Sequence, residues 1–402
     1  KNMRRHRGMS TVRRPMMTDR IKRSNLWTRF KIVILAVAAA AVVLVVIFFG
    51  FPLIEDLIRG VDPSARYQPK VEAKFEKEEQ TQHEEIVSKE IYTNKDYKMK
   101  NEPYADGDNI IFTTQKQRGS AGGMDGVVVY NTQSGEARLL VNTEKKYDEF
   151  INPVLSGNTA VFLDSMADGG GRILGYDMAN DKQFVIKEYA YAAPQLALSG
   201  ERLAFMQWAG DETQRLYVYD VKTREAATVK LYDKGTVRGS AVDISANDMV
   251  WAESDGKGSS TLKRIAFAED GTSKYDNYNF GDAVYEPKTN GKDIVFKTEE
   301  YGVTVSLMLS VSGGAPVMLA DGVSNYGIGD DFVVYSKGEQ LYVAYTDAQE
   351  TSQITSDVTK NILASANGNG LCYYDMTDKA AEASVADDVA KYAYVPKLTG
   401  VE

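Results

Sequence analysis

The chain has 402 residues, 43% hydrophobic and 26% charged, which is enough apolar material for a packed core and excludes a disordered chain. Its single cysteine, Cys372, excludes an internal disulfide, and its only histidines, His6 and His83, exclude a histidine-based metal site in the later part of the chain. The net charge of -9 combines a tail of +10 over residues 1–31 with about -19 in the remainder, so the larger part of the chain would repel nucleic acid.

The first predicted element is a membrane anchor. Residues 32–51 read IVILAVAAAAVVLVVIFFGF, an uncharged run that is long enough, as a helix, to cross a hydrocarbon layer of about 30 Å. A cleaved signal peptide is the alternative, but no small-x-small cleavage site follows Phe51. We therefore predict one transmembrane helix in contact with the lipid bilayer, with the anchoring side chains Ile32, Leu35, Val42, Leu44, Ile47 and Phe51.

Charge sets the predicted orientation of this anchor. Residues 1–31 form a basic tail that ends with Arg29 and Lys31, whereas Glu55 and Asp56 follow the helix. Because the basic flank of a span stays in the cytoplasm, we expect a cytoplasmic N-terminus and an extracytoplasmic C-terminal domain. The sequence has no Asn-x-Ser/Thr glycosylation site, which favours a bacterial cell membrane.

A charged stalk is predicted over residues 52–100. Lys and Glu are dense in it, and its apolar positions are too sparse for a coiled coil. Its end, Ile86 to Tyr92, alternates between apolar and polar residues and is predicted to be a strand that closes the domain beyond it.

Residues 101–402 contain an internal repeat. A turn with Gly or Asn followed by an apolar strand recurs every 38 to 50 residues or so, as in GDNIIF, GNTAVF, GERLAF, GKDIVF and GDDFVVY. A second strand, often ending in Tyr-Asp, and a third strand follow each copy, and segments such as NPVLSG and YEPKTNG supply an inner strand before it. Four strands at this period are typical of β-propeller blades. We therefore predict an all-β propeller ectodomain, with seven blades favoured over six.

This pattern resembles the TolB-type propeller repeat, which is similar to the propellers of dipeptidyl peptidase IV relatives. The resemblance implies the fold only, because the usual Ser-Pro-Asp-Gly turn is reduced here to short turns such as LSG, TNG and ADG. The peptidase half of the dipeptidyl peptidase relatives is absent from this sequence, as is a G-x-S-x-G nucleophile motif.

No catalytic residue, cofactor site or metal site is predicted. Acidic residues in the loops are numerous enough to meet by chance, and the Gly-rich loops lack the Lys-Ser/Thr of a phosphate loop. A ligand face is predicted where residues fall at or just past the ends of apolar strands, although packing between blades is the favoured alternative for the aromatic ones. The residues of this predicted face are Trp208, Asp211, Trp251 and Tyr301.

The sequence thus indicates a single-pass membrane protein whose propeller is a recognition or scaffold module of the cell envelope. Its predicted partner is an envelope protein, a peptide or a glycan, and not nucleic acid. The alternative is a surface glycoside hydrolase or lyase that uses loop carboxylates. A deep pocket with carboxylates of raised pKa would favour the alternative, and a broad shallow face would favour recognition.

Overall fold

The computed structural model places much of the chain from residue 86 onward. Within this part no helix is long and apolar enough to cross a membrane. The predicted tail and anchor, residues 1–31 and 32–51, lie outside the described residues, as does most of the predicted stalk. The described residues are 86–91, 97, 99, 103–115, 124–143, 149–166, 169–209, 213–233, 238–254, 260–267, 273–278, 283–300, 304–346, 351–356, 360–376 and 389–396.

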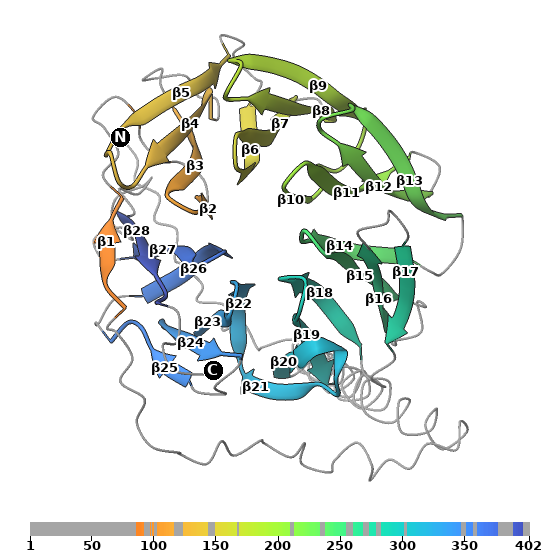
Figure 1. The fold of residues 1–402 in the computed structure, drawn as a ribbon, viewed down its shortest axis with the longest axis vertical. Coiled ribbons are helices and arrows are strands. Elements are labelled where there is room, and N and C mark those ends of the chain that lie inside the picture. The colour runs from red at the N-terminus through yellow and green to blue at the C-terminus, as the bar shows by residue number, and fades with distance from the viewer. Residues whose placement is uncertain are drawn as a thin grey trace, which may run out of the picture. The chain divides into compact units, whose positions relative to one another are not determined.

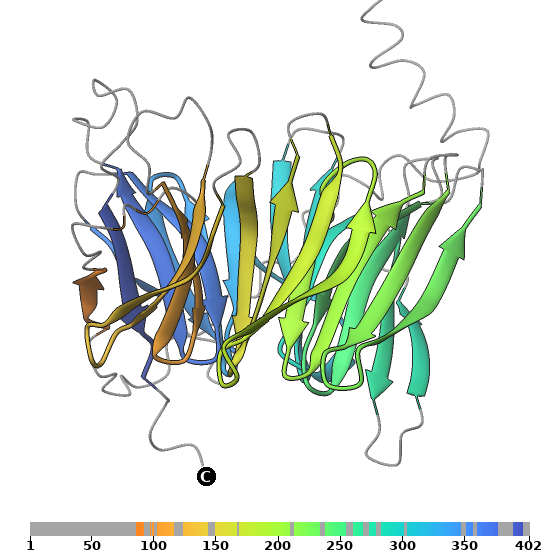
Figure 2. The ribbon, with the colours of Figure 1, turned by 90° about the horizontal axis from the view of Figure 1, so that it is seen from above.

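Seven four-stranded antiparallel sheets surround a central axis, which confirms the predicted all-β, seven-blade propeller (Figure 1). Seen from the side, the strands of each blade run between two faces, one with tight turns and one with longer connections (Figure 2). Blades 1 to 4 consist of β2 (Tyr104–Asp106), β3 (Asn109–Thr114), β4 (Gly126–Asn131) and β5 (Ala137–Asn142); β6 (Glu149–Ser156), β7 (Thr159–Ser165), β8 (Gly171–Asp177) and β9 (Lys182–Tyr189); β10 (Leu196–Ser199), β11 (Arg202–Trp208), β12 (Gln214–Asp220) and β13 (Glu225–Tyr232); and β14 (Arg238–Ile244), β15 (Asp248–Ser254), β16 (Ser260–Phe267) and β17 (Ser273–Tyr278).

The last three blades follow the same order, with a short 3₁₀ turn, η2 (Val311–Gly313), between the third and fourth strands of blade 5. They consist of β18 (Val284–Thr289), β19 (Ile294–Glu300), β20 (Thr304–Ser310) and β21 (Val317–Asp321); β22 (Val323–Ile328), β23 (Phe332–Lys337), β24 (Gln340–Tyr345) and β25 (Thr351–Gln353); and β26 (Lys360–Asn367), β27 (Gly370–Met376), β28 (Val389–Tyr394) and β1 (Ser88–Glu90).

Blade 7 is closed by the N-terminal strand. β1 pairs antiparallel with β28, with Ser88 opposite Ala393 and Glu90 opposite Lys391. This confirms the predicted closing strand at Ile86 to Tyr92. The first and last described strands therefore share one sheet, so the ring leaves no open seam between its ends.

The core lies between the blades. Apolar side chains of each second strand are buried on both sheet faces; β7, for example, buries four consecutive apolar residues, Ala160 to Leu163. One cluster joins Val161 and Leu163 of blade 2 to Leu203 and Phe205 of blade 3. Because a single blade has two apolar faces, it is stabilised only by stacking against both of its neighbours.

Side chains at the tight turns also link successive blades. Asp106 accepts a hydrogen bond from the Gly157 amide (2.6 Å), and Ser156 accepts one from the Gly200 amide (2.9 Å). In blade 5, Asn290 donates to the Gly329 carbonyl (3.0 Å). The short turn residues noted in the sequence therefore fix the spacing of adjacent blades.

Candidate binding site in the central cavity

Five of the seven inner strands contain a β-bulge that shapes the centre of the ring. In β6, β14, β18, β22 and β26 the register against the second strand shifts by one extra residue. A bulge reverses the inward and outward alternation of the residues that follow it, so it decides which side chains face the axis.

Seven residues stand at equivalent positions on the inner strands, five of them on bulged strands, and we call them the axial ring. Each stands three residues before a turn glycine, or before Ala246, which takes the place of that glycine in blade 4. All seven line a central cavity of about 670 Å³, within the size range of small-molecule sites. In blade order they are Tyr104, Val154, Ala197, Asp243, Lys288, Tyr326 and Ser365.

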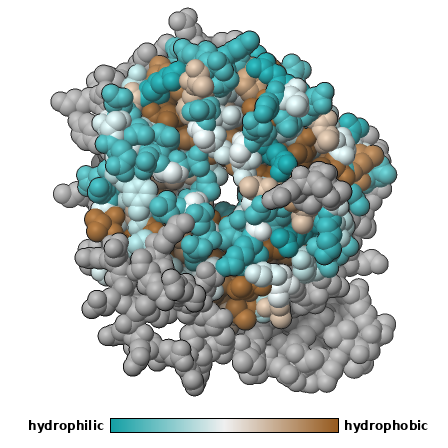
Figure 3. Space-filling model, viewed as in Figure 1, coloured by the Kyte–Doolittle hydropathy of each residue, from teal (hydrophilic) through white to brown (hydrophobic). Residues whose placement is uncertain are grey.

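The opening of this cavity is visible at the middle of one face (Figure 3). Residues around it are mostly hydrophilic, in contrast to the apolar material between the blades. Polar side chains next to the axial ring, including those of Asn152, Gln195 and Asn325, add amide donors and acceptors to the wall.

Asp243 is the acidic member of the axial ring. Its Oδ2 accepts a hydrogen bond from the Thr289 amide at 2.8 Å, which ties the end of β14 to β18. The seven blades enclose the carboxylate, and this burial raises its pKa to about 6, although the nearby Lys288 ammonium acts in the opposite direction. Asp243 can therefore exchange a proton near neutral pH.

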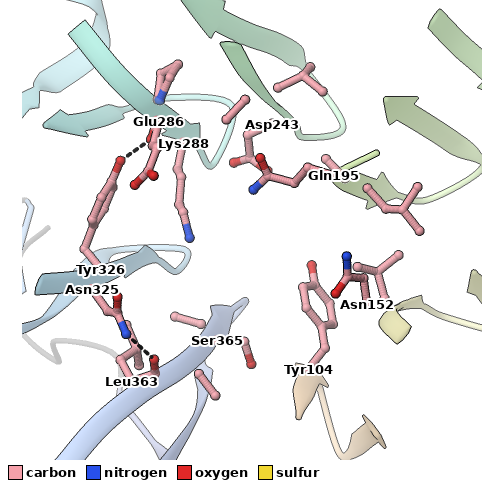
Figure 4. A pocket seen from close by; sticks show the side chains of 18 of the residues that line it. Tyr104, Asn152, Gln195, Asp243, Glu286, Lys288, Asn325, Tyr326, Leu363 and Ser365 are labelled. Carbon is pink, nitrogen blue, oxygen red and sulfur yellow. Dashed lines mark hydrogen bonds between the residues drawn. The ribbon is translucent and has the colours of Figure 1, made fainter. Parts of the chain in front are cut away.

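Lys288 is the basic member, and it stands beside an aromatic wall. Its ammonium lies 5.3 Å from the centroid of the Tyr326 ring, and the ammonium of Lys297 lies 5.2 Å from the same centroid. Lys297 also forms an ion pair with Glu286 at 3.0 Å. Lys288 and Asp243 project toward the cavity from neighbouring strands, as Figure 4 shows.

The opposite side of the axial ring is neutral. The Tyr104 side chain points into the cavity from β2 (Figure 4), and burial together with the nearby Asp243 and Asp106 raises its pKa. Ser365 donates to the Pro103 carbonyl at 2.9 Å and accepts from the Ala105 amide at 3.1 Å, so its hydroxyl serves to join blades 7 and 1.

Backbone strain is concentrated at the same level of the cavity. Asn152 and Glu286 have φ values of 50° and 47°, and each precedes a proline within a bulge. Left-handed backbone is costly for Glu, and a following proline disfavours it further, so the surrounding ring must hold this geometry in place. Strain of this kind clusters at functional sites.

The chemistry of the cavity is that of a small polar site whose wall carries two carboxylates, Asp243 and Glu286, and two ammonium groups, Lys288 and Lys297. Within the described residues no cluster of three or more His, Cys, Asp and Glu side chains has the arrangement of a metal site. Glu286, the other carboxylate lining the cavity, is ion-paired with Lys297 and more than half exposed.

Two of the four residues of the predicted ligand face lie in the described part of the chain. Trp208 ends β11 on the face with the longer connections, is 38% exposed, and lies under the Arg238 guanidinium at 5.5 Å. Trp251 is 0% exposed, and its indole donates to the Tyr232 hydroxyl of the preceding blade at 2.8 Å. Packing between blades, the favoured alternative, therefore describes Trp251. Asp211 and Tyr301 lie outside the described residues.

Sequence reasoning missed the axial ring, although part of the signal was present. The inner-strand segment YEPKTNG carries a Glu and a Lys where an apolar strand would be expected, and the equivalent segment of blade 4 carries Asp243. Charged residues in a strand predicted to be innermost would have indicated a polar channel. Which of them face the axis depends on the bulges, which the sequence does not mark.

Comparisons with known proteins identify the architecture. No protein-family model matches the chain, and no curated protein matches it. An oligogalacturonate lyase from Vibrio parahaemolyticus matches in structure with 11% identity, a TM-score of 0.53, and coverage of 79% of this chain and 99% of that one. An acylaminoacyl peptidase from Pyrococcus horikoshii matches with 12% identity, a TM-score of 0.51, and coverage of 70% and 49%.

TolB from Acinetobacter baumannii also matches, with 15% identity, a TM-score of 0.41, and coverage of 58% of this chain and 60% of that one. The chain thus spans 60% of the TolB chain and about half of the peptidase chain. TolB-like and acylaminoacyl-peptidase propellers are among its structural neighbours, and the likeness is one of fold alone.

Proposed function

We propose that this protein is a membrane-anchored, extracytoplasmic recognition module of the cell envelope, which binds its partner or ligand through the central cavity of the propeller. The observation that carries the proposal is the axial ring: seven inner strands present one position each to a polar cavity of about 670 Å³. A closed, rigid ring with variable residues at equivalent positions suits selective binding.

Recognition explains the cavity better than hydrolysis does. A two-carboxylate glycosidase needs an acid and a second carboxylate free to act as base or nucleophile. Asp243 has the raised pKa that an acid needs, but Glu286 is committed to Lys297 at 3.0 Å. The glycoside hydrolase or lyase alternative is the competing outcome of the enzyme assays described below.

A photocrosslinking residue at Gln195 tests the recognition site in intact cells. Gln195 lines the cavity and is exposed to it, whereas Glu225 is exposed on the outer strand β13 and serves as the matched control position. We expect specific crosslinks from position 195 that are weakened by Asp243→Asn, and none of these from position 225. Equal products from both positions would contradict a cavity site.

Enzyme assays provide the second arm of this test. The full-length protein should show no turnover on panels of glycoside, uronide, ester and peptide substrates. Turnover that is abolished by Asp243→Asn would replace the recognition proposal with the hydrolase or lyase alternative.

Membrane topology is tested separately by labelling with an impermeant thiol reagent. Cys372 is buried, and burial raises the pKa of its thiol to about 12, so the native cysteine should stay silent. A cysteine introduced at Glu225 should be labelled in intact cells, whereas one introduced in residues 1–31 should react only after lysis. Labelling of the tail alone would reverse the proposed orientation.

A further inference from the structure

We propose that the central cavity binds a small zwitterion, a free amino acid or a short peptide with uncapped ends, whose ammonium group lies at Asp243 and whose carboxylate lies at Lys288. This inference rests on the proposed recognition function and names the ligand class of that site. It starts from the distribution of charge around the axial ring.

The charges of the axial ring are confined to two adjacent blades. Asp243 and Lys288 are members of blades 4 and 5, and the other five members are neutral. Glu286 and Lys297, the other charged residues of the wall, form an ion pair at 3.0 Å and belong to blade 5. A ligand in the cavity therefore meets carboxylates and ammonium groups on the side of blades 4 and 5, and neutral members of the axial ring elsewhere.

Asp243 and Lys288 both line the cavity, and their side chains project toward it from adjacent blades (Figure 4). The Asp243 carboxylate also raises the pKa of two other cavity residues, Tyr104 in blade 1 and Tyr326 in blade 6, with burial as the largest cause in each case. A ligand in the cavity can therefore approach both charged side chains.

Complementarity then selects the ligand. An amine alone would be attracted by Asp243 but repelled by Lys288, and a carboxylate alone would meet the opposite conflict. A neutral sugar would desolvate both charges and compensate neither. A zwitterion satisfies both, and the amides of Asn152, Gln195 and Asn325 can hydrogen-bond its peptide or side-chain groups.

The backbone supports this reading because it holds Lys288 in place. The bulge at Glu286 and Pro287 sets the register that turns Lys288 toward the axis. The Thr289 amide, one residue further, fixes one oxygen of Asp243 at 2.8 Å. One short segment of β18 therefore positions both of the charges that the ligand would contact.

Calorimetric titration of the full-length protein in detergent at pH 7.5 tests the proposal with four alanine probes. These are alanine, dialanine, N-acetyl-dialanine and dialanine amide, with cellobiose as a neutral probe. We expect alanine or dialanine to bind, and removal of either terminal charge to weaken binding by about 10-fold or more, as expected for loss of a charged hydrogen bond. Tighter binding of alanine would identify a free amino acid, and tighter binding of dialanine a chain end.

Variants assign each end of the probe. Asp243→Asn should weaken the binding of dialanine but leave the binding of N-acetyl-dialanine unchanged. The substitution removes the contact with a free ammonium group, and N-acetyl-dialanine has no such group. Lys288→Met should act in the same way on the carboxylate end. Glu225→Gln and Lys182→Met, both on exposed outer strands, are the matched charge controls and should bind as the native chain does.

The pH dependence gives an independent readout. Protonation of Asp243, with its pKa of about 6, should weaken the binding of dialanine by about 10-fold between pH 7.5 and pH 5. Asp243→Asn should abolish this change. The other groups acting on Asp243 are Lys288 and Asp248; Asp248 is buried and ion-paired with Arg264 at 2.7 Å. Tyr104 and Tyr326, whose pKa values are raised, stay neutral over this range.

Equal binding of capped and uncapped probes, tighter binding of cellobiose, or weakening of every probe by Asp243→Asn would overturn the zwitterion site. If no probe binds while the crosslinks from position 195 persist, this inference fails and the recognition function stands. If the crosslinks are lost as well, both fail. A thermal unfolding scan of each variant separates a lost contact from a misfolded protein.

Discussion

The inner strands of blades 2 and 5 have the same backbone device and opposite chemistry. β6 and β18 each carry a bulge, a residue with φ near 50° and a proline directly after it, at Asn152-Pro153 and Glu286-Pro287. The bulge of β6 brings Val154 to the axis, whereas that of β18 brings Lys288. The comparison shows that the same bulge can bring an apolar or a charged side chain to the cavity wall, depending on the residue at one position of the blade.

The largest expected effect tests whether the two blades are equivalent as scaffold. Phe162 of β7 and Phe296 of β19 are both fully buried in the second strand of their blades. Replacing either with Ala should lower the free energy of unfolding by about 3–5 kcal/mol, because a large cavity is left in a packed core. Urea denaturation measures the loss.

The control for this pair is Tyr285→Ala, since Tyr285 is exposed and should cost less than about 1 kcal/mol. A loss of stability in only one of the two Phe variants would show that the blades differ in scaffold as well as in chemistry.

The next largest expected effect is a dependence of the unfolding free energy on pH, which the charged residue of β18 should change and the apolar residue of β6 should not. The Asp243 pKa of about 6 lies above its ordinary value of 3.8, so the folded state binds this proton more tightly than the unfolded state. The stability that the group contributes is fully present well below its ordinary pKa of 3.8 and is lost as pH rises through about 6. Relative to Asp243→Asn, the native chain should therefore lose about 2–2.5 kcal/mol of unfolding free energy between pH 4 and pH 7.

Paired denaturation curves at pH 4, 5, 6 and 7 measure this difference. Lys288→Met should raise the Asp243 pKa further and enlarge the effect, because the Lys288 ammonium lowers that pKa. Val154→Met in blade 2 should leave the effect unchanged, because neither side chain carries a charge. A difference that does not vary with pH would mean that the cavity is open enough to solvate the carboxylate fully.

The smallest effect concerns the strained residues that both strands share. At position 286, Gly should be more stable than Ala by about 1 kcal/mol, because a left-handed backbone costs an alanine that much. Both variants remove the ion pair with Lys297, so the comparison isolates the backbone. Position 152 should show the same sign.

Thermal unfolding of the Gly and Ala variants provides the measurement. At Gln183, an exposed residue of β9 that pairs in register with Tyr176, the order should reverse, with Ala more stable than Gly by about 0.5–1 kcal/mol. The same order at positions 152, 286 and 183 would argue against stored strain in the bulges.

Much of the fold could be predicted because it depends on local and repeated features. The spacing of turns and apolar strands indicates four-stranded blades, and the alternating segment at Ile86 to Tyr92 indicates the closing strand that β1 confirms. The turns after the second strands are also local: the Asn131 and Asp177 side chains accept hydrogen bonds from the backbone amides two residues on, at 3.1 and 3.0 Å. Such features depend on neighbours within a few residues.

The sequence alone therefore determines the four-stranded blade and indicates the strand that closes the ring, because period-2 patterns, turns and buried runs are local. It favours seven blades over six, and the structure has seven. The tertiary structure alone decides the cavity. Tyr104, Asp243 and Lys288 meet only after ring closure brings distant inner strands together. A bulge of one extra residue also reverses which side chains point inward, so alternation along the sequence does not reveal which charges face the axis.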